Sequence, residues 1–471
     1  MGKNFGWTRR AGRAAVVCGM VGGTLAALTP LAQATSTGTL YVSTTGTDSG
    51  TCRLAANPCQ TISYALTKAP AGATIKVAAG DYSQPLQITQ AVTILGAGSS
   101  AATGTVIDPS TLIADTDTDS TEPQDAVIDI PNATGVTLKN LDVDGQNAQG
   151  NFTGCGTDFV GVYYHDSSGT MTGVQVTNIQ LAQDLFGCQD GQAVYVTSDV
   201  GDTSSVAMTK LNVNAYDKNG VTCDDAGTTC TLGTSKITGI GATPLTAQNG
   251  FQGFNTASVT LSGDTIKGNS YTGGGPGNSA SGILIYDVGT VSLTGNTVSA
   301  SDVDVYLGDD GTGPAAQTWT VSGNTVSKGT DNVNGGEQGY GDGIDLDSTS
   351  NPVTISDNTV TTDAEYGIAL TGASNATVTG NTVTKNKSDG IYVGGPGSVN
   401  TTSSGDTISD NTSSSNKGDG ILADSDSSGN VFEGNIAAQN VTYDLEDQGS
   451  GDSWPGNTCR PAHDSNPAGL C

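Results

Sequence analysis

Two aspartates lie two residues apart in Ile344-Asp345-Leu346-Asp347, where aliphatic and acidic residues alternate. Alternation indicates a β-strand, so we expect Asp345 and Asp347 on one face with their Cα atoms about 6.7 Å apart. Asp304 is expected about one strand spacing away on the same face. Inverting glycosidases place an acid and a base carboxyl roughly 6.5–9.5 Å apart, so this trio is a candidate catalytic centre for glycoside hydrolysis. Two alternatives stay open: the same oxygens could bind Ca²⁺, or they could be ordinary solvated surface acids.

Tyrosines are expected beside these carboxyl groups. Tyr286, Tyr306 and Tyr392 occupy alternate positions that would point away from a core. A shallow surface that carries tyrosines and carboxylates suits a sugar polymer, because a tyrosine combines an apolar ring with a polar tip. These three residues are therefore the candidate substrate contacts.

Few basic residues could act as a proton acceptor. Lys218 could serve in a lysine-dependent polysaccharide lyase, although a surface role is also open. After residue 34 the only arginines are Arg53 and Arg460, each beside a cysteine, which argues against an arginine-dependent lyase. His165 could be a general base, but we expect it to be a surface residue.

The chain contains two alternating repeat phrases. The first reads Gly/Asp-Asn/Asp-Thr-Val/Ile and begins at Gly263, Gly295, Gly323, Asp357, Gly380 and Gly405. The second is a glycine followed by an aliphatic or aromatic residue, at Gly161, Gly220, Gly250, Gly282, Gly343, Gly367, Gly390 and Gly420.

Each phrase opens a short run of period two, and Asn, Asp and Gly between the runs favour turns. Short strands that recur without a helical pattern between them predict a parallel β-solenoid. Stacked coils would align Asn296, Asn324, Asn358 and Asn381 in a ladder of hydrogen-bonded amides. We read Asp342, with Asn219, Asn249, Asp389 and Asp419, as an Asn/Asp-Gly turn.

These coils resemble the right-handed parallel β-helix, or pectin-lyase-like, superfamily. The segment from Leu40-Tyr41-Val42-Ser43 to Gly80-Asp81-Tyr82 is similar to the N-terminal part of its secreted bacterial members. The resemblance covers most of residues 39–445 and implies an all-β fold. The superfamily includes lyases, hydrolases, epimerases, transferases and non-catalytic adhesins, so it implies no single activity. The Gly-His-Gly and Arg-Ile-Lys blocks of polygalacturonases are missing from the sequence.

Charge and the first residues bear on the compartment. The net charge of −29 argues against nucleic acid and anionic membranes as partners.

Basic residues precede an apolar run over 14–32, and Ala32-Gln33-Ala34 matches a signal-peptidase site. We therefore expect residues 1–34 to be a signal peptide and the protein to be secreted. No later stretch is apolar enough to be inserted in a membrane.

Eight cysteines remain after Cys18, an even number that suits an oxidising compartment. Their spacing suggests four local disulfides, Cys52–Cys59, Cys155–Cys188, Cys223–Cys230 and Cys459–Cys471. A zinc site is disfavoured because the sequence has only two histidines and no CxxC.

We expect an N-terminal cap and first coil over 35–100, with a short helix near 62–66. Residues 101–445 are expected to form about a dozen right-handed parallel β-helix coils, and 446–471 a C-terminal cap. The expected function is binding of an extracellular polysaccharide by a monomer that requires no cofactor. Cleavage by the paired aspartates and Ca²⁺ binding are left open. The alternatives are a non-catalytic extracellular binding or adhesion scaffold and a lysine-dependent lyase. The acidic segment 115–119 resembles the start of a calcium loop but lacks its glycine and final glutamate.

Overall fold

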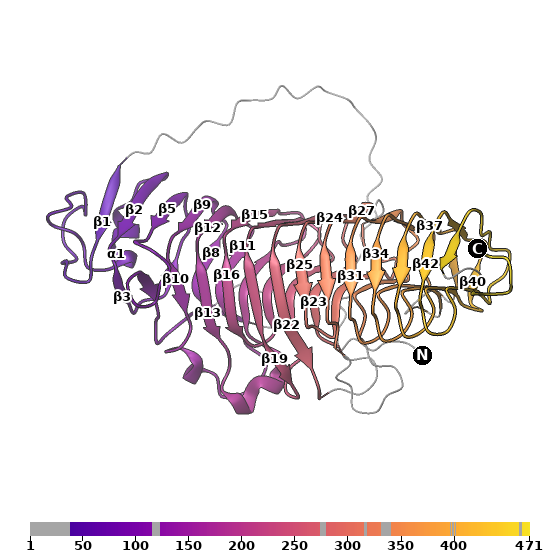
Figure 1. Ribbon diagram of the computed structural model, residues 1–471. Coiled ribbons are helices and arrows are strands. Elements are labelled where there is room, and N and C mark those ends of the chain that lie inside the picture. Colours follow the sequence, from indigo (N-terminus) through magenta and orange to yellow (C-terminus); the bar gives the residue numbers. More distant parts are fainter. Residues whose placement is uncertain are drawn as a thin grey trace, which may run out of the picture.

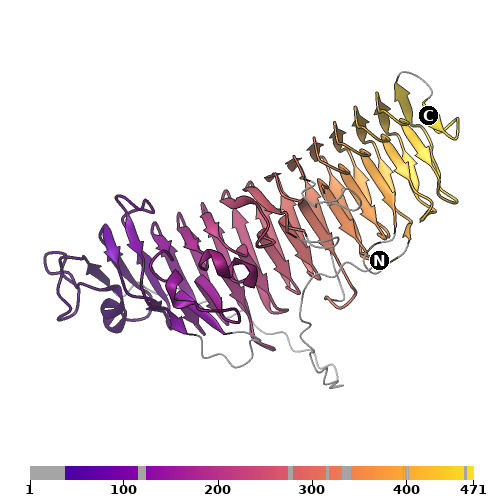
Figure 2. The same cartoon turned by 90° about the horizontal axis from the view of Figure 1, so that it is seen from below.

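The computed structural model is a right-handed parallel β-helix, and it describes residues 38–114, 123–273, 279–314, 318–330, 341–395, 397, 400, 402–460 and 464–471. Its coils stack along one long axis, from the indigo N-terminal end to the yellow C-terminal end (Figure 1; Figure 2). Successive strands of a coil enter three different sheets, and each strand pairs in parallel with the strands one coil away. The first and second sheets have 14 strands each, close to the dozen coils expected. The predicted fold class is confirmed.

The three sheets run the length of the molecule. The first contains β1 (Thr39–Val42), β2 (Ala73–Val77), β5 (Val92–Leu95), β9 (Thr134–Lys139), β12 (Ser168–Thr172), β15 (Ser204–Thr209), β18 (Thr228–Gly233), β21 (Ser258–Ser262), β24 (Thr290–Thr294), β27 (Thr318–Ser322), β30 (Val353–Ser356), β33 (Thr377–Thr379), β37 (Thr407–Ser409) and β41 (Val431–Glu433). The second contains β3 (Gly80–Tyr82), β6 (Thr105–Ile107), β10 (Asp142–Asp144), β13 (Gln175–Ile179), β16 (Asn212–Tyr216), β19 (Lys236–Thr243), β22 (Thr265–Tyr271), β25 (Thr297–Ser299), β28 (Thr325–Ser327), β31 (Thr359–Thr361), β34 (Thr382–Thr384), β38 (Thr412–Ser414), β42 (Ile436–Ala438) and β44 (Thr458–Arg460). The third contains β4 (Leu86–Gln87), β8 (Gln124–Pro131), β11 (Asp158–His165), β14 (Gln192–Thr197), β17 (Asn219–Asp224), β20 (Asn249–Phe254), β23 (Ser281–Tyr286), β26 (Val303–Gly308), β29 (Ile344–Asp347), β32 (Ile368–Thr371), β35 (Ile391–Gly394), β39 (Ile421–Ala423), β43 (Leu445–Asp447) and β45 (Ser465–Asn466).

A few elements lie outside these stacks. Strand β7 (Ile113–Ala114) pairs antiparallel with β8, and β36 (Ser403–Ser404) pairs with β40 (Ser427–Ser428). Helix α1 (Ile62–Lys68) lies near the N-terminal end, where the Thr61 hydroxyl accepts a hydrogen bond from the Tyr64 N–H. Two short 3-10 helices, η1 (Gln149–Asn151) and η2 (Gln183–Cys188), lie in the loops between the second and third sheets.

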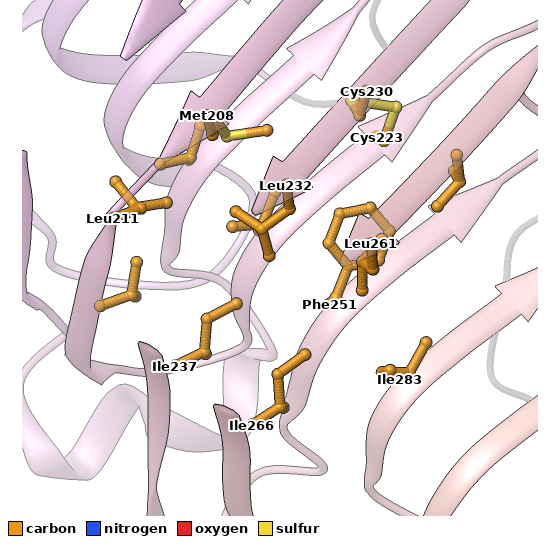
Figure 3. Packing of buried hydrophobic residues seen from close by; sticks show 14 of the residues in the cluster. Met208, Leu211, Cys223, Cys230, Leu232, Ile237, Phe251, Leu261, Ile266 and Ile283 are labelled. Carbon is orange, nitrogen blue, oxygen red and sulfur yellow. A yellow bond between two sulfur atoms is a disulfide. The ribbon is translucent and has the colours of Figure 1, made fainter. Parts of the chain in front are cut away.

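The core is a column of aliphatic side chains that equivalent positions contribute coil after coil. Met208, Leu232 and Leu261 face inward from neighbouring strands of the first sheet and are fully buried (Figure 3). Ile237 and Ile266 do the same from the second sheet, again without exposed surface. This stacking explains why each repeat needs an aliphatic residue at the same position.

All four expected disulfide pairs are present, Cys52–Cys59, Cys155–Cys188, Cys223–Cys230 and Cys459–Cys471. They fit the oxidising environment of an extracellular or periplasmic protein. Among the described residues, no helix has both the length and the apolar character that a membrane crossing requires. The expected signal peptide, residues 1–34, lies outside the described residues.

The expected asparagine ladder is present and longer than predicted. Asn296, Asn324, Asn358 and Asn381 are each at most 2 % exposed, and every Nδ2 donates to the Oδ1 of the next at 2.9–3.0 Å. The ladder then continues in the same way through Asn411 and Asn435 to Asn457. The side-chain amides and the backbone N–H groups of these asparagines are hydrogen-bonded, so the buried polar residues stabilise the stacked coils.

A second ladder explains the glycine of the other repeat phrase. Asn386 donates to Asn416, and Asn416 donates to Asn440, at 3.2 and 3.0 Å between Nδ2 and Oδ1. A Cβ atom at Gly367 would lie 2.3 Å from Asn386 Nδ2, and one at Gly420 would lie 2.5 Å from Asn440 Nδ2. Glycine is therefore required where the ladder passes over the start of a third-sheet strand.

The Asn-Gly turn prediction is wrong at two positions. Asn219 and Asn249 are the first residues of β17 and β20, where their side chains join a hydrogen-bonded network described below. Tertiary pairing of the strand overrides the local turn preference there.

Candidate functional site

The outward-facing side of the third sheet carries most of the side chains that could do chemistry. Its inward residues belong to the core, so the alternate positions form rows that run along the helix axis. One row contains Asp129, Tyr163, Tyr195, Thr222, Gln252, Leu284, Tyr306, Asp345, Ala369 and Tyr392. The next row includes Asp224, Phe254, Tyr286, Gly308, Asp347, Thr371 and Gly394. We call this surface the outer face.

Asp345 and Asp347 lie together on the outer face, as expected. Asp345 is opposite Tyr306 of the preceding coil, and the Tyr306 hydroxyl donates to Asp347 Oδ2 at 2.8 Å. Ser348 Oγ donates to Asp347 Oδ1 at 2.7 Å, and Thr371 Oγ1 donates to Asp345 Oδ1 at 3.2 Å. Asp345 is 1 % exposed and Asp347 has no exposed surface, so they are not solvated surface acids.

Asp287 and Asp309 join them. The backbone N–H of Asp309 donates to the Asp347 carbonyl at 3.3 Å, which places this loop directly beside β29. Burial and a hydrogen bond with the Asp309 carboxyl raise the pKa of Asp287 to about 8. We call Asp287, Asp309, Asp345 and Asp347 the acidic cluster. The cluster contains a proton donor near neutral pH together with further carboxyl groups.

Asp304 is not part of the acidic cluster. Its backbone N–H donates to the Asp342 carbonyl, so in the strand register Asp304 lies beside the residues that precede β29 and not beside Asp345. Its side chain has no exposed surface, accepts a hydrogen bond from the Ser301 N–H and is close to Asp363. The expectation of an outward catalytic Asp304 is wrong, because the carboxyl turns back toward the preceding turn.

The three tyrosines occupy different environments. Tyr286 is half-buried and stacks on Phe254 with 6.0 Å between ring centroids. Tyr306 is 1 % exposed and belongs with the acidic cluster. Tyr392 stacks on Tyr366 at 4.5 Å and donates its hydroxyl to Asp424 at 2.6 Å. Of the three, Tyr286 is the best placed to offer a ring to a ligand.

His165 is buried on the outer face rather than exposed, contrary to expectation. Its Nε2 is 3.2 Å from Asp129 Oδ1, and its ring stacks on Tyr163 at 4.7 Å. Tyr163 in turn stacks on Tyr195 at 5.3 Å. Stacking and the carboxylate partner hold the imidazole in place.

Between these two regions lies a network of amide side chains that the sequence did not indicate. Asn249 Nδ2 donates to Asn219 Oδ1 at 3.1 Å, and Asn219 Nδ2 donates to Thr222 Oγ1 at 3.0 Å. Thr222 then donates to Gln192 Oε1, and Gln192 Nε2 donates to Asp158 Oδ2 at 2.8 Å. Gln252 Oε1 accepts from both Asn219 and Asn249 at 3.2 Å. We call Gln192, Asn219, Thr222, Asn249 and Gln252 the amide network.

Lys218 lies immediately before β17, beside the amide network. Its Nζ donates to the Ala247 carbonyl at 2.6 Å and to Gln189 Oε1 at 3.2 Å. Burial lowers the pKa of Lys218 to about 8. Both hydrogen bonds tie the loop that follows η2 to the loop before β20, which is a structural role.

The described residues contain no cluster of three or more His, Cys, Asp or Glu side chains with the geometry of a metal site. The acidic segment 115–119 and His463 lie outside the described residues. Ca²⁺ binding therefore stays a prediction.

Comparisons with known proteins give one family match and several matches among solved structures. The family described as periplasmic copper-binding protein (NosD) matches residues 248–458. No curated protein matches the chain. Among solved structures, the Dettilon tailspike protein is 16 % identical with a TM-score of 0.44, and the match covers 62 % of this chain and 55 % of the tailspike.

Two further structures differ in their named activities. A mutant of the periplasmic alginate epimerase AlgG is 11 % identical with a TM-score of 0.48, over 77 % of each chain. The lacto-N-biosidase of Eubacterium ramulus is 10 % identical with a TM-score of 0.38, over 89 % of this chain and 67 % of the enzyme. At these identities the likeness concerns the fold alone.

The residues matched by the NosD family do not suit copper. Copper favours thiolate, thioether and imidazole ligands. Residues 248–458 contain no cysteine, methionine or histidine. The parallel register of the three sheets makes the chain a right-handed parallel β-helix by its fold, and residues 248–458 are similar to the NosD family.

Proposed function

We propose that the protein binds an extracellular polysaccharide along the outer face and hydrolyses it at the acidic cluster. One observation carries the proposal. The Asp287–Asp309 pair, in which the raised pKa of Asp287 keeps a proton near neutral pH, lies close to Asp345 and Asp347. Tyr286 and Tyr306 lie beside these carboxyl groups. Hydrolysis of a glycosidic bond needs such a combination of acid and base.

The steps follow from the positions of the groups. The Asp287–Asp309 pair donates its proton to the glycosidic oxygen as the bond to the anomeric carbon breaks. Asp345 or Asp347 takes a proton from the water that attacks this carbon. The half-buried ring of Tyr286, stacked on Phe254, supports the sugar beside the bond.

The test is an assay of new reducing ends on a panel of polysaccharides. Asp345→Asn and Asp347→Asn should abolish turnover, since neither amide can accept the proton from water. Asp142→Asn is the matched control, because Asp142 is a fully buried carboxyl on β10 of the second sheet, away from the outer face. Full turnover in both cluster variants would refute hydrolysis at this site. Ultraviolet absorbance from an unsaturated product would instead indicate elimination and point to Lys218.

Binding without cleavage is the second candidate. It is favoured by the burial of Asp345 and Asp347, which are at most 1 % exposed. A scaffold of this kind would retain a polysaccharide with no new reducing ends, and the cluster variants would leave that retention unchanged.

A further inference from the structure

The amide network has fixed donors and acceptors. At one end the Ser281 backbone N–H, which can only donate, contacts Asn249 Oδ1 at 3.0 Å. At the other end Asp158 accepts from Gln192 Nε2. These two anchors determine which side-chain atom of every amide between them is oxygen and which is nitrogen.

With the oxygen and nitrogen atoms assigned in this way, the Nε2 donor of Gln252 has no acceptor within the amide network. Asn249 and Asn219 both direct their Nδ2 atoms at Gln252, so the Gln252 oxygen must face them and accept both hydrogen bonds. The Gln252 Nε2 then makes no hydrogen bond to any described residue, and the residue is only 2 % exposed. The small exposed surface of this residue includes the Nε2 atom, so the amide can donate outward to water or to a ligand.

The Gln252 side chain has the uncharged amide network on one side and an aromatic pair on the other. Gln252 and Phe254 are two residues apart on β20, so both side chains lie on the outer face. Phe254 stacks on Tyr286, which gives a half-buried aromatic pair beside the amide. An amide donor next to an aromatic surface is a suitable site for a sugar ring, whose oxygens accept hydrogen bonds and whose C–H face is apolar.

Charge indicates which kind of sugar fits. The described strands of the third sheet contain no lysine or arginine, whereas they contain Asp129, Asp158, Asp224, Asp345 and Asp347. A chain of uronic acids would bring one negative charge for each sugar to this acidic surface, where no cation on the strands offsets the repulsion.

Building on the proposed function, we infer that Gln252 and the Phe254–Tyr286 pair form a subsite for an uncharged sugar, in which Gln252 Nε2 donates to a hydroxyl or acetamido oxygen. The amide network holds the Gln252 side chain in position before the sugar arrives. The subsite selects neutral chains over polyuronates.

The test is affinity electrophoresis of the whole protein in gels that contain neutral or anionic polysaccharides. Hydroxyethylcellulose, galactomannan and glycol chitin are the neutral probes, and carboxymethylcellulose, polygalacturonate and alginate are the anionic ones. Hydroxyethylcellulose and carboxymethylcellulose share one backbone, so they differ mainly in charge. We expect retardation by at least one neutral polymer and weaker retardation by its anionic counterpart.

Two substitutions test the hydrogen bond that Gln252 Nε2 is proposed to donate. Gln252→Glu keeps an oxygen for Asn219 and Asn249 but removes the donated hydrogen bond, and Gln252→Leu removes both. The dissociation constant for the neutral polymer, measured well below the unfolding midpoints, should rise about tenfold in both variants. The midpoint should fall in both, because Gln252→Leu removes the acceptor and Gln252→Glu buries a carboxyl group. Gln175→Leu is the matched control, because Gln175 has similar amide contacts on the second sheet and should leave binding unchanged.

Each outcome decides the question. Unchanged binding of the neutral polymer in both Gln252 variants, or retardation by anionic polymers only, would overturn the subsite and leave the proposed function intact. The absence of retardation by any of the six polymers, with the protein folded, would overturn the proposed function and the subsite with it.

Discussion

Substitution of Asp363 by asparagine should stabilise the protein at neutral pH. Asp363 occupies the position of an asparagine in the second ladder, since its N–H donates to Asn386 Oδ1 and its Oδ1 accepts from the Gly329 N–H. Its Oδ2 takes the place of the amide nitrogen but has no hydrogen-bond partner among the described residues. Asp304 Oδ2 is equally unpaired and nearby. Asp363→Asn supplies the N–H that the ladder lacks.

The magnitude follows from the pKa of the buried pair. Burial raises the pKa of Asp363 to about 8, well above the usual value for an aspartate, and burial together with the neighbouring Asp363 raises the pKa of Asp304. The native state therefore holds a proton that the unfolded state loses above pH 4. The stability from this proton is fully present below pH 4 and declines by about 1.4 kcal/mol per pH unit until pH 8. At pH 7, Asp363→Asn should raise the free energy of unfolding by on the order of 2–4 kcal/mol relative to the wild type.

The assay is urea denaturation at pH 5, 7 and 8 for the wild type and the variant. The difference between them should be small at pH 5 and grow toward pH 8. Asp81→Asn is the control, because Asp81 is an exposed carboxyl on β3 that belongs to neither ladder. A difference that is the same at all three pH values would refute the shared proton.

Three further outcomes test other parts of the structure. Asn358→Ala should lower the free energy of unfolding by about 2–5 kcal/mol, because it leaves the backbone N–H and one side-chain N–H of Asn324 without acceptors. Denaturation midpoints will show this loss. Gly367→Ala should be destabilising by several kcal/mol, since the new Cβ would lie 2.3 Å from Asn386 Nδ2, and thermal unfolding with a wild-type midpoint would contradict the second ladder. Asp345→Asn should abolish the release of reducing ends with little change in the melting temperature, and loss of folding instead would show that Asp345 is structural.

The coils and their ladders could be predicted because they depend on a strict repetition of residue types. Asparagine recurs at one position and aliphatic residues at the next, and each stacked copy satisfies its neighbour. The disulfide partners could be predicted because three of the pairs are separated by 7 or 12 residues, which leaves little choice of partner. Most of the fold could therefore be predicted from the regular repetition of residue types along the chain.

The site could be predicted only in part. Alternation placed Asp345 and Asp347 correctly on β29, but it failed for Asp304 at the irregular start of β26. There Val303 packs with Leu284 and Tyr306 on the outer face, and the Asp304 carboxyl turns to the Ser301 N–H. The amide network was missed because its members come from coils of unequal length, so no fixed spacing brings them into line.

The last rung of the asparagine ladder has a consequence for assembly. Asn457 Nδ2 donates to the carbonyl of Leu470, which the Cys459–Cys471 disulfide holds against the end of the helix. The tail thus covers the C-terminal end of the β-helix. Without it, the final coil would expose an unpaired amide and the edges of its strands, to which another molecule could bind. We therefore expect reduction of the Cys459–Cys471 disulfide to loosen the tail and favour end-to-end association of molecules.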